Sequence, residues 1–399
     1  MRAVKWISSV IAVIVLISAL VFFGNFFSKN SSSVSNTNSN KTAPATTKSH
    51  SDSKKGIQVT SKNDNSSYQT VIKNGRYLTS KARGVTASQE SNTFNQVSFE
   101  SGLLNFSKKH FSTSKYIFQE GQYLTADQAN NWLGRQSDDN QEGLNPRDNG
   151  KFNNERNPIY LQTIEEQDFM TKEGNNLKLN GIVLGLAMNT QDTYQKEQYG
   201  ADYTQDISKA DRISQGQKMA NEIVKRYRKI NGINNDTPIY VAMYAQAKDD
   251  TLAGGSFYSW NVSKSGDNLG NWTNVDNQTV VLPVQANTEN EKSVSSKLNS
   301  SFMNFSDNIE SFFPNLSSVT GQASYDGNNL QGLIVSVSTQ FYSATEIESF
   351  ANYIAQSAPN YLPSGVPIKI KIEASTGMQA YLIKNADSDK YKVTILGSY

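Results

Sequence analysis

The hydrophobic pattern of the chain begins with an apolar segment at the N-terminus. An uncharged run rich in Ile, Val, Leu and Phe extends from Trp6 to Ser28 and follows Arg2 and Lys5. It can supply the roughly 20 residues that a membrane-spanning helix needs, and positive residues ahead of it favour a cytoplasmic N-terminus. We therefore predict a signal anchor or transmembrane helix over residues 1–28, a single-pass location in the cell membrane, and the bulk of the chain on the extracellular side.

A long polar segment follows. Residues 29–67 are rich in Ser, Asn, Thr and Lys and contain no aromatic residue. Such a composition cannot bury enough apolar surface to offset the entropy lost on ordering. We predict a disordered tether that lifts a folded domain, residues 68–399, away from the bilayer. We expect this domain to subdivide near residues 170 and 290.

Three stretches of the folded domain have helical periodicity. Residues 207–230 place apolar positions on one stripe and basic residues in the last turns, as in a surface helix. Apolar positions in residues 298–313 step by three and four until Pro314 stops the pattern. A third helix is predicted from Ser343, which forms a capping box with Glu346.

Shorter runs have the features of strands. GIVLGLAM and GLIVSVS are almost wholly apolar, whereas PIKIKIE alternates Ile with charged residues, which predicts one buried and one exposed face. Four more runs predict strands: PIYVAMYA, GSFYSWNVS, MQAYLIK and YKVTIL. The predicted class is α+β, with mixed and antiparallel sheets and flanking helices.

One internal similarity links the two halves of the domain. The string GNNL occurs at residues 174–177 and again at 327–330, and each copy precedes an apolar strand, a helix and a strand that begins with Pro238 or Pro367. We predict two diverged β-α-β-β units. Equivalent strand ends would then carry Thr190, Gln191, Thr339 and Gln340, where a shared polar site or ordinary strand-end hydrogen bonding would explain the residue types equally well.

Composition narrows the classes of function. Lys and Arg total 38 against 36 Asp and Glu, which is too balanced for the basic face that nucleic-acid binding requires. The absence of cysteine excludes disulfides, thiol nucleophiles and thiolate metal sites. Only two histidines occur, and His50 lies in the polar tract, so we predict no metal site and no cofactor.

The segment from Tyr68 to about Met170 is less regular and more distinctive. It contains NGRYLTSKARGVT, FESGLLNFSKKHF, YIFQEGQYLT and WLGRQSDDNQEGLNP, and later strings include SFFPNLSSVTGQA and YLPSGVPIKIKIEA. In this order the strings closely resemble the CamS family, surface lipoproteins of Gram-positive bacteria described as sex pheromone precursors or sex pheromone biosynthesis proteins. The resemblance covers the chain from Tyr68 to Tyr399.

The resemblance implies an exported lipoprotein whose leader releases a short hydrophobic signal peptide just before a lipidated cysteine. The segment that matches such a peptide here comprises Ala12, Val13, Ile14, Val15, Leu16, Ile17 and Ser18. Ile17, Ser18 and Ala19 fit the lipid-attachment motif, but Leu20 stands where the cysteine should be. Lipidation is therefore excluded, and we expect the longer apolar segment to hold the protein in the membrane instead.

Ionisable residues are densest between positions 135 and 168. The candidate ligand-facing residues are Trp132, Arg135, Asp138, Asp139, Glu142 and Arg156, together with the four strand-end residues above. Pairs of arginines and carboxylates that fasten irregular loops are the favoured interpretation of this cluster. Because no nucleophile elbow, Walker loop or dinucleotide motif is present, we predict no catalytic residue.

Three functions stay open. The first is a noncatalytic, membrane-anchored surface domain that binds an envelope component or a protein partner. The second is a cell-wall hydrolase that uses carboxylates between Glu142 and Asp168, including Glu165 and Glu166. The third is a glycan- or peptide-binding module in which exposed rings such as Trp132 and Trp260 stack on the ligand.

Overall fold

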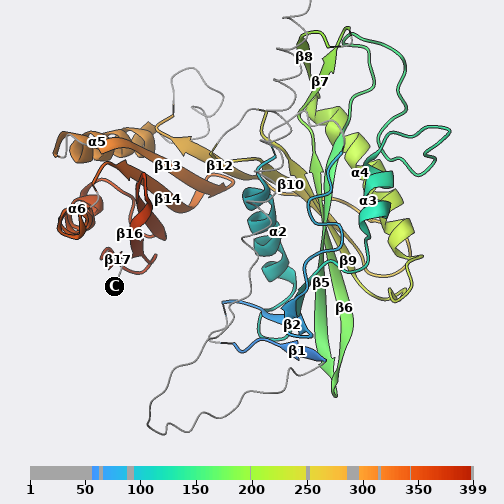
Figure 1. Cartoon of the computed structure of the whole chain (residues 1–399), viewed down its shortest axis with the longest axis horizontal. Coiled ribbons are helices and arrows are strands. Elements are labelled where there is room, and N and C mark those ends of the chain that lie inside the picture. The colour runs from blue at the N-terminus through green and yellow to red at the C-terminus, as the bar shows by residue number, and fades with distance from the viewer. Residues whose placement is uncertain are drawn as a thin grey trace, which may run out of the picture. The chain divides into compact units, whose positions relative to one another are not determined.

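The fold is built around one long hairpin, strands β5 (Leu161–Glu173) and β6 (Asn176–Met188). The computed structural model describes residues 56–62, 66–87, 94–197, 199–248, 252–284, 296–312, 316–341 and 343–396, all within one compact unit that spans Ser53–Tyr399 (Figure 1). Among these residues, no helix combines the length and the hydrophobicity needed to cross a membrane.

The hairpin lies in the middle of a mixed sheet that has nine strands in the described part of the chain. Its order is β1-β2-β4-β5-β6-β9-β10-β11, with β3 paired to β2. The remaining strands are β1 (Ile57–Val59), β2 (Gln69–Lys73), β3 (Arg76–Tyr77), β4 (Ile117–Glu120), β9 (Ile239–Ala245), β10 (Ser256–Ser263) and β11 (Thr273–Asn274). A separate two-stranded ribbon joins β7 (Gln191–Gln195) to β8 (Asp202–Asp206).

Both faces of this sheet are covered, which explains why GIVLGLAM is apolar throughout. Ile182, Leu184 and Leu186 point into the core shared with α3 (Ala126–Leu133) and α4 (Lys209–Tyr227). Val183 and Ala187 point into the core beneath α2 (Gln96–His110). Figure 1 shows α2 on one side of β5 and β6, and α3 and α4 on the other.

The second sheet begins with β12 (Asn277–Leu282). Its order is β12-β13-β14-β15-β16-β17. The other strands are β13 (Leu316–Asp326), β14 (Asn329–Thr339), β15 (Ile368–Ala374), β16 (Gly377–Lys384) and β17 (Lys392–Ile395), and the helices are α5 (Ser296–Phe312), α6 (Ala344–Ser357) and the short 3-10 helix η2 (Ala358–Asn360). Ile368, Ile370 and Ile372 are buried in its core, so the predicted one-sided burial of PIKIKIE is confirmed.

The two predicted units share one topology. In the first, β5 and β6 form a hairpin, β6 runs parallel to β9, and β9 pairs antiparallel with β10. In the second, β13, β14, β15 and β16 repeat these relations. Each hairpin turns at a glycine with positive φ, Gly174 at 62° and Gly327 at 57°, a conformation that glycine adopts without steric cost.

The register of the two units agrees as well. The pairing of β5 with β6 skips Asn180 just before Gly181, and the pairing of β13 with β14 skips Gln331 just before Gly332. The next amide in each case donates to the carbonyl oxygen of the strand-leading proline, at 3.0 Å from Ile182 to Pro238 and at 3.1 Å from Leu333 to Pro367. A bulge depends on the local sequence, so a bulge at the equivalent position of each unit supports the prediction that the two units are related.

The α+β class and the three predicted helices are confirmed, and three boundaries need correction. Residue 170 lies inside β5, and the change of sheet occurs between β11 and β12, earlier than residue 290. β1 lies inside the predicted tether, because Ile57 and Val59 pair with β2 and Val59 packs on the core. Helices α2 and α3 were not predicted. The anchor, residues 1–28, and the peptide segment at residues 12–18 lie outside the described residues.

Candidate functional site

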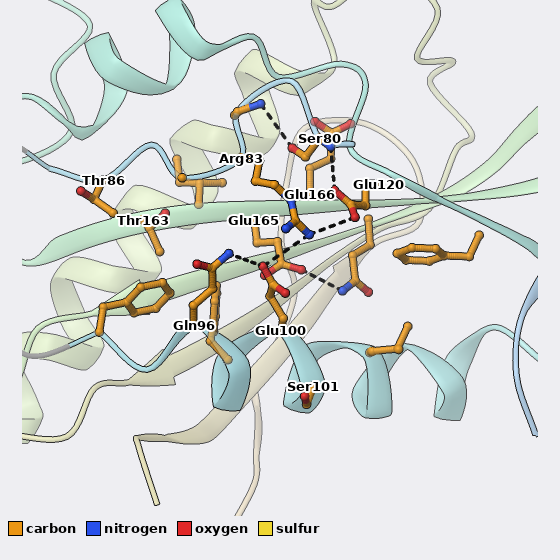
Figure 2. Close-up of a pocket in the computed structure, with 18 of the residues that line it drawn as sticks. Ser80, Arg83, Thr86, Gln96, Glu100, Ser101, Glu120, Thr163, Glu165 and Glu166 are labelled. Atoms are coloured by element: carbon orange, nitrogen blue, oxygen red, sulfur yellow. Dashed lines mark hydrogen bonds and ion pairs between the residues drawn. The ribbon is translucent and has the colours of Figure 1, made fainter. Parts of the chain in front are cut away.

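A cavity of about 800 Å³ opens between helix α2, strand β5 and the segment that carries Ser80 to Thr86. Six charged residues line it: Arg83, Glu100, Glu120, Glu165, Glu166 and Lys248 (Figure 2 labels all but Lys248). We call it the acidic pocket. Phenylalanines form its apolar wall, namely Phe94, Phe99 and Phe118.

The alternation of strand β5 decides which carboxylates reach the acidic pocket. Successive strand side chains point to opposite faces of a sheet. Gln167 accepts a hydrogen bond from Ser107 of α2, so residues 165 and 167 face this helix. Glu166 accepts a hydrogen bond from Tyr227 of α4, so residues 166 and 168 face the other core. Glu165 and Glu166 are neighbours in sequence but lie in different environments.

Arg83 is clamped by Glu120. Its Nε and Nη2 donate to the two oxygens of the Glu120 carboxylate at 3.1 and 3.0 Å, and the backbone N–H of Ser80 donates to the same carboxylate at 2.7 Å. The carboxylate of Glu100 lies 3.7 Å from Nη2 on the other side. The hydrogen bond to Glu120 raises the pKa of Arg83, so the guanidinium stays charged and largely neutralised by Glu120.

Glu165 is the least compensated of these groups. Its Oε1 accepts one hydrogen bond, from Gln167 Nε2 at 3.0 Å. Burial raises the pKa of Glu165 to about 7; the Gln167 bond and Arg83 lower it, while Glu100 and Glu120 raise it further. A carboxylate offers about four acceptor positions, so Glu165 can accept further hydrogen bonds from a donor that enters the pocket.

Glu166 borders the same cavity, but its carboxylate has a structural role. The backbone N–H groups of Gln122, Tyr123 and Leu124 donate to it at 3.1, 2.9 and 2.7 Å. Asp168 is fully buried beside it and accepts from the N–H of Gln122 at 3.0 Å. Burial and the neighbouring Glu166 raise the pKa of Asp168 well above its usual value. These two carboxylates hold the loop that leads into α3.

Several members of the predicted charged cluster make contacts between loops. Asp138 binds Arg147 at 2.8 Å, and Arg135 donates to the carbonyl oxygen of Pro146. The carbonyl oxygen of Glu142 accepts from Arg226 at 2.7 Å, and Asp139 is exposed. None of these side chains lines the acidic pocket.

Of two other predicted residues, Trp132 is buried and Arg156 is partly buried. Trp132 was expected to be an exposed stacking ring, but it is only 3% exposed, because it packs against Tyr227 beneath the guanidinium of Arg226. Arg156 pairs with the buried Asp192 at 2.8 Å and stacks over Tyr194.

The four strand-end residues also occupy different environments. The carbonyl oxygen of Thr190 accepts from Ile207, and Thr339 Oγ1 accepts from the N–H of Phe341, both ordinary strand-end bonds. Gln340 is exposed. Gln191 is the one strand-end residue of these four that lines the acidic pocket in the described part of the chain, where its amide donates to the carbonyl oxygen of Lys248 at 2.8 Å.

Arg83, Glu100 and Glu120 were missed by the sequence reasoning. A signal for Glu100 was present, because Phe99, Leu103, Phe106 and His110 recur at helical spacing after the cap residue Asn95. Among the described residues, no group of three or more histidine, cysteine, aspartate or glutamate side chains has the arrangement of a metal site.

Comparisons with known proteins agree on one family. The family model described as CamS sex pheromone cAM373 precursor matches residues 77–390. The crystal structure of a sex pheromone precursor from Lactobacillus salivarius subsp. salivarius UCC118 is similar, with a TM-score of 0.81, 48% sequence identity, and coverage of 86% of this chain and 100% of that one. The C-terminal domain of the sex pheromone staph-cAM373 precursor from Staphylococcus aureus has a TM-score of 0.65 and 27% identity, covering 78% of this chain and 99% of that domain. No curated protein sequence matches the chain.

Proposed function

Because the chain belongs to the CamS sex pheromone precursor family, we propose that it is a membrane-anchored, noncatalytic surface protein whose folded domain binds a cell-wall ligand in the acidic pocket. The observation that carries this proposal is the unequal pairing of charges around the cavity. Glu120 neutralises Arg83, while Glu100 and Glu165 keep acceptor capacity toward the cavity.

The charge balance favours a ligand that carries an ammonium group. Three carboxylates face one guanidinium, and the ammonium group of Lys248 at the rim pairs with Asp206 at 2.9 Å. An ammonium group entering beside Glu165 would supply the hydrogen-bond donor and the positive charge that this carboxylate lacks. The phenylalanine wall would receive the aliphatic stem that carries such a group. A lysine side chain of a wall peptide has both features.

The test compares two peptides that differ in one charge. We expect Nα-acetyl-lysyl-D-alanyl-D-alanine to bind the full chain in nanodiscs, and its Nε-acetylated form to bind at least 5-fold more weakly, as measured by isothermal titration calorimetry at pH 8. Glu165→Gln should weaken binding of the charged peptide by about 5- to 10-fold, roughly 1–1.4 kcal/mol. Affinity of the native chain should rise from pH 6 to pH 8 as Glu165 ionises, and that of the variant should not.

Glu173→Gln is the matched control, because Glu173 is an exposed residue of the same strand outside the pocket. It should bind like the native chain. Equal affinity for both peptides, or an unchanged affinity in Glu165→Gln, would contradict an ammonium site.

A carboxylate-dependent wall hydrolase is the second candidate, and one observation favours it. A carboxyl group whose pKa lies at about 7 in a pocket has the protonation state of a general acid at neutral pH. Glu166 and Asp168, the other carboxylates first considered for this role, hold backbone N–H groups instead. Release of reducing sugars from purified wall glycan by the native chain, lost in Glu165→Gln, would establish hydrolysis in place of binding alone.

The N-terminal segment supports the membrane part of the proposal. Residues 6–28 carry no charge, and the chain has no cysteine that could accept a lipid. A retained helix would hold the domain more firmly than one acyl chain. Release of the peptide at residues 12–18 as a signal is the alternative to a retained helix, because it requires cleavage of the leader.

A further inference from the structure

Four aromatic side chains gather beside helix α2, away from the acidic pocket. Phe106 and His110 come from α2, Tyr240 from β9 and Trp260 from β10. The ring of His110 lies 4.6 Å from each of the other three, measured between ring centroids. We call these four residues the aromatic cluster.

The aromatic cluster lies at the rim of the core and not inside it. Phe99, Leu103 and Phe169 fill the core beneath α2 and are almost fully buried, whereas all four cluster rings are only partly buried. Phe106, His110 and Trp260 also line a cavity of about 480 Å³. That volume is within the range of about 300–1,000 Å³ typical of small-ligand sites.

The rest of this cavity wall mixes polar with apolar side chains and carries balanced charge. Amide side chains from α2 and β12 line it, namely Asn105, Asn277 and Gln278. Lys109 and Asp326 contribute one charge of each sign. Burial and the neighbouring Lys109 lower the pKa of His110, so the imidazole is neutral at pH 7.

Helix geometry separates this cavity from the acidic pocket. Gln96, Glu100 and Leu104 are spaced by four residues and line the acidic pocket. Asn105 and Lys109 are also spaced by four and line the second cavity. At 100° per residue, position 109 is turned about 180° from position 100, so the two cavities lie on opposite flanks of α2.

We propose that the aromatic cluster and its amide rim form a binding site for a neutral oligosaccharide of flat pyranose rings. The axial C–H groups of such a ring make an apolar face that packs on aromatic rings, while its hydroxyl groups need donors and acceptors at the edge. Asparagine and glutamine amides offer both in one side chain. One lysine and one aspartate leave the lining without a net charge to attract a charged ligand, and a purely apolar ligand would leave the amides unpaired.

The test follows the tryptophan emission of the full chain in nanodiscs, with tetra-N-acetylchitotetraose and cellotetraose as probes, and assigns to Trp260 the change that is absent in Trp260→Ala. At least one tetrasaccharide should shift the emission and bind saturably. Trp260→Ala should weaken binding, measured by calorimetry, at least 10-fold. Trp272→Phe is the matched control, because Trp272 packs against the other core and should leave the affinity unchanged.

Two further variants keep the test decisive if Trp260→Ala misfolds. Asn105→Ala alters an exposed α2 residue at the cavity edge and should weaken binding several-fold. Glu165→Gln, in the acidic pocket, should leave saccharide affinity unchanged. A failure of the proposed ammonium site can therefore be distinguished from a failure of the proposed saccharide site. The proposal is overturned if neither tetrasaccharide binds, or if Asn105→Ala and folded Trp260→Ala bind like the native chain.

Discussion

At the scale of single residues, two neighbouring buried carboxylates differ in their hydrogen bonds, because both oxygens of Glu166 accept donors whereas only Oδ2 of Asp168 does. Glu166 accepts three backbone N–H groups and the Tyr227 hydroxyl group, while Oδ1 of Asp168 has no partner among the described residues. A carboxylate with several donors is stabilised as an anion, and one without them favours its protonated form.

This difference predicts opposite effects of the two amide substitutions. Asp168→Asn should keep the native stability at pH 5 and lose less of it by pH 8. A raised folded-state pKa means that the group stabilises the fold below its unfolded value of about 4 and that this contribution fades as pH rises toward the folded value. Glu166→Gln should lower the free energy of unfolding by on the order of 2–3 kcal/mol at both pH values. The glutamine amide has one oxygen, so it cannot accept at both positions where the carboxylate does.

Urea unfolding of each variant at pH 5, 6.5 and 8 checks both effects. A pH profile of Asp168→Asn that is parallel to the native one would show that Asp168 is ionised in the folded protein.

At the scale of elements, helix α3 should depend on its capping box. Thr125 Oγ1 accepts from the N–H of Gln128, and Gln128 Oε1 accepts from the N–H of Thr125. Thr125→Ala removes the first bond and should lower the free energy of unfolding by about 1 kcal/mol. Asn130→Ala, at an exposed position of the same helix, should be neutral or slightly stabilising, since alanine has the higher helix propensity. Equal effects of the two substitutions in urea unfolding would mean that the cap contributes nothing.

Helix α3 also shows what a sequence pattern can and cannot predict. The capping box at Ser343 and Glu346 led to the prediction of α6, and an equivalent signal at Thr125 and Gln128 was overlooked because the surrounding segment has many polar residues. Helix α2 was harder to predict, because its third buried position is Ser107, which interrupts an apolar stripe.

The acidic pocket could not be predicted from sequence for a different reason. Arg83, Glu120 and Glu165 are far apart in the chain and meet only through the pairing of β4 with β5 and the packing of α2. Periodicity indicates which face a residue occupies on its own strand. It does not indicate which distant residue lies opposite.

At the scale of the whole molecule, the two large sheets of the described part each contain a four-strand unit of the same topology. The GNNL strings that indicated two related units mark equivalent hairpin turns, at residues 174–177 and 327–330. Of the two units, only the first carries α2 and the acidic pocket. The pocket is therefore formed with elements that lie outside the shared topology.

The mode of attachment can be tested on the full chain with one substitution. We expect the native protein to be recovered from washed membranes with an intact N-terminus, as mass spectrometry would show. Leu20→Cys completes the motif Ile17-Ser18-Ala19-Cys and should shift the protein to a cleaved, lipid-modified form. A native protein cut near Ser18 and found in the medium would instead support release of the leader peptide.

Helix α2 sets the distance between the two proposed sites, which matters for a polymeric ligand. Glu100 and His110 are ten residues apart, about 15 Å along a rigid helix axis. A wall fragment that carries both a peptide and a glycan could engage the two flanks at once. The second contact would then form at the effective concentration set by that spacing, so two sites of modest strength would retain a cross-linked polymer while releasing its small fragments.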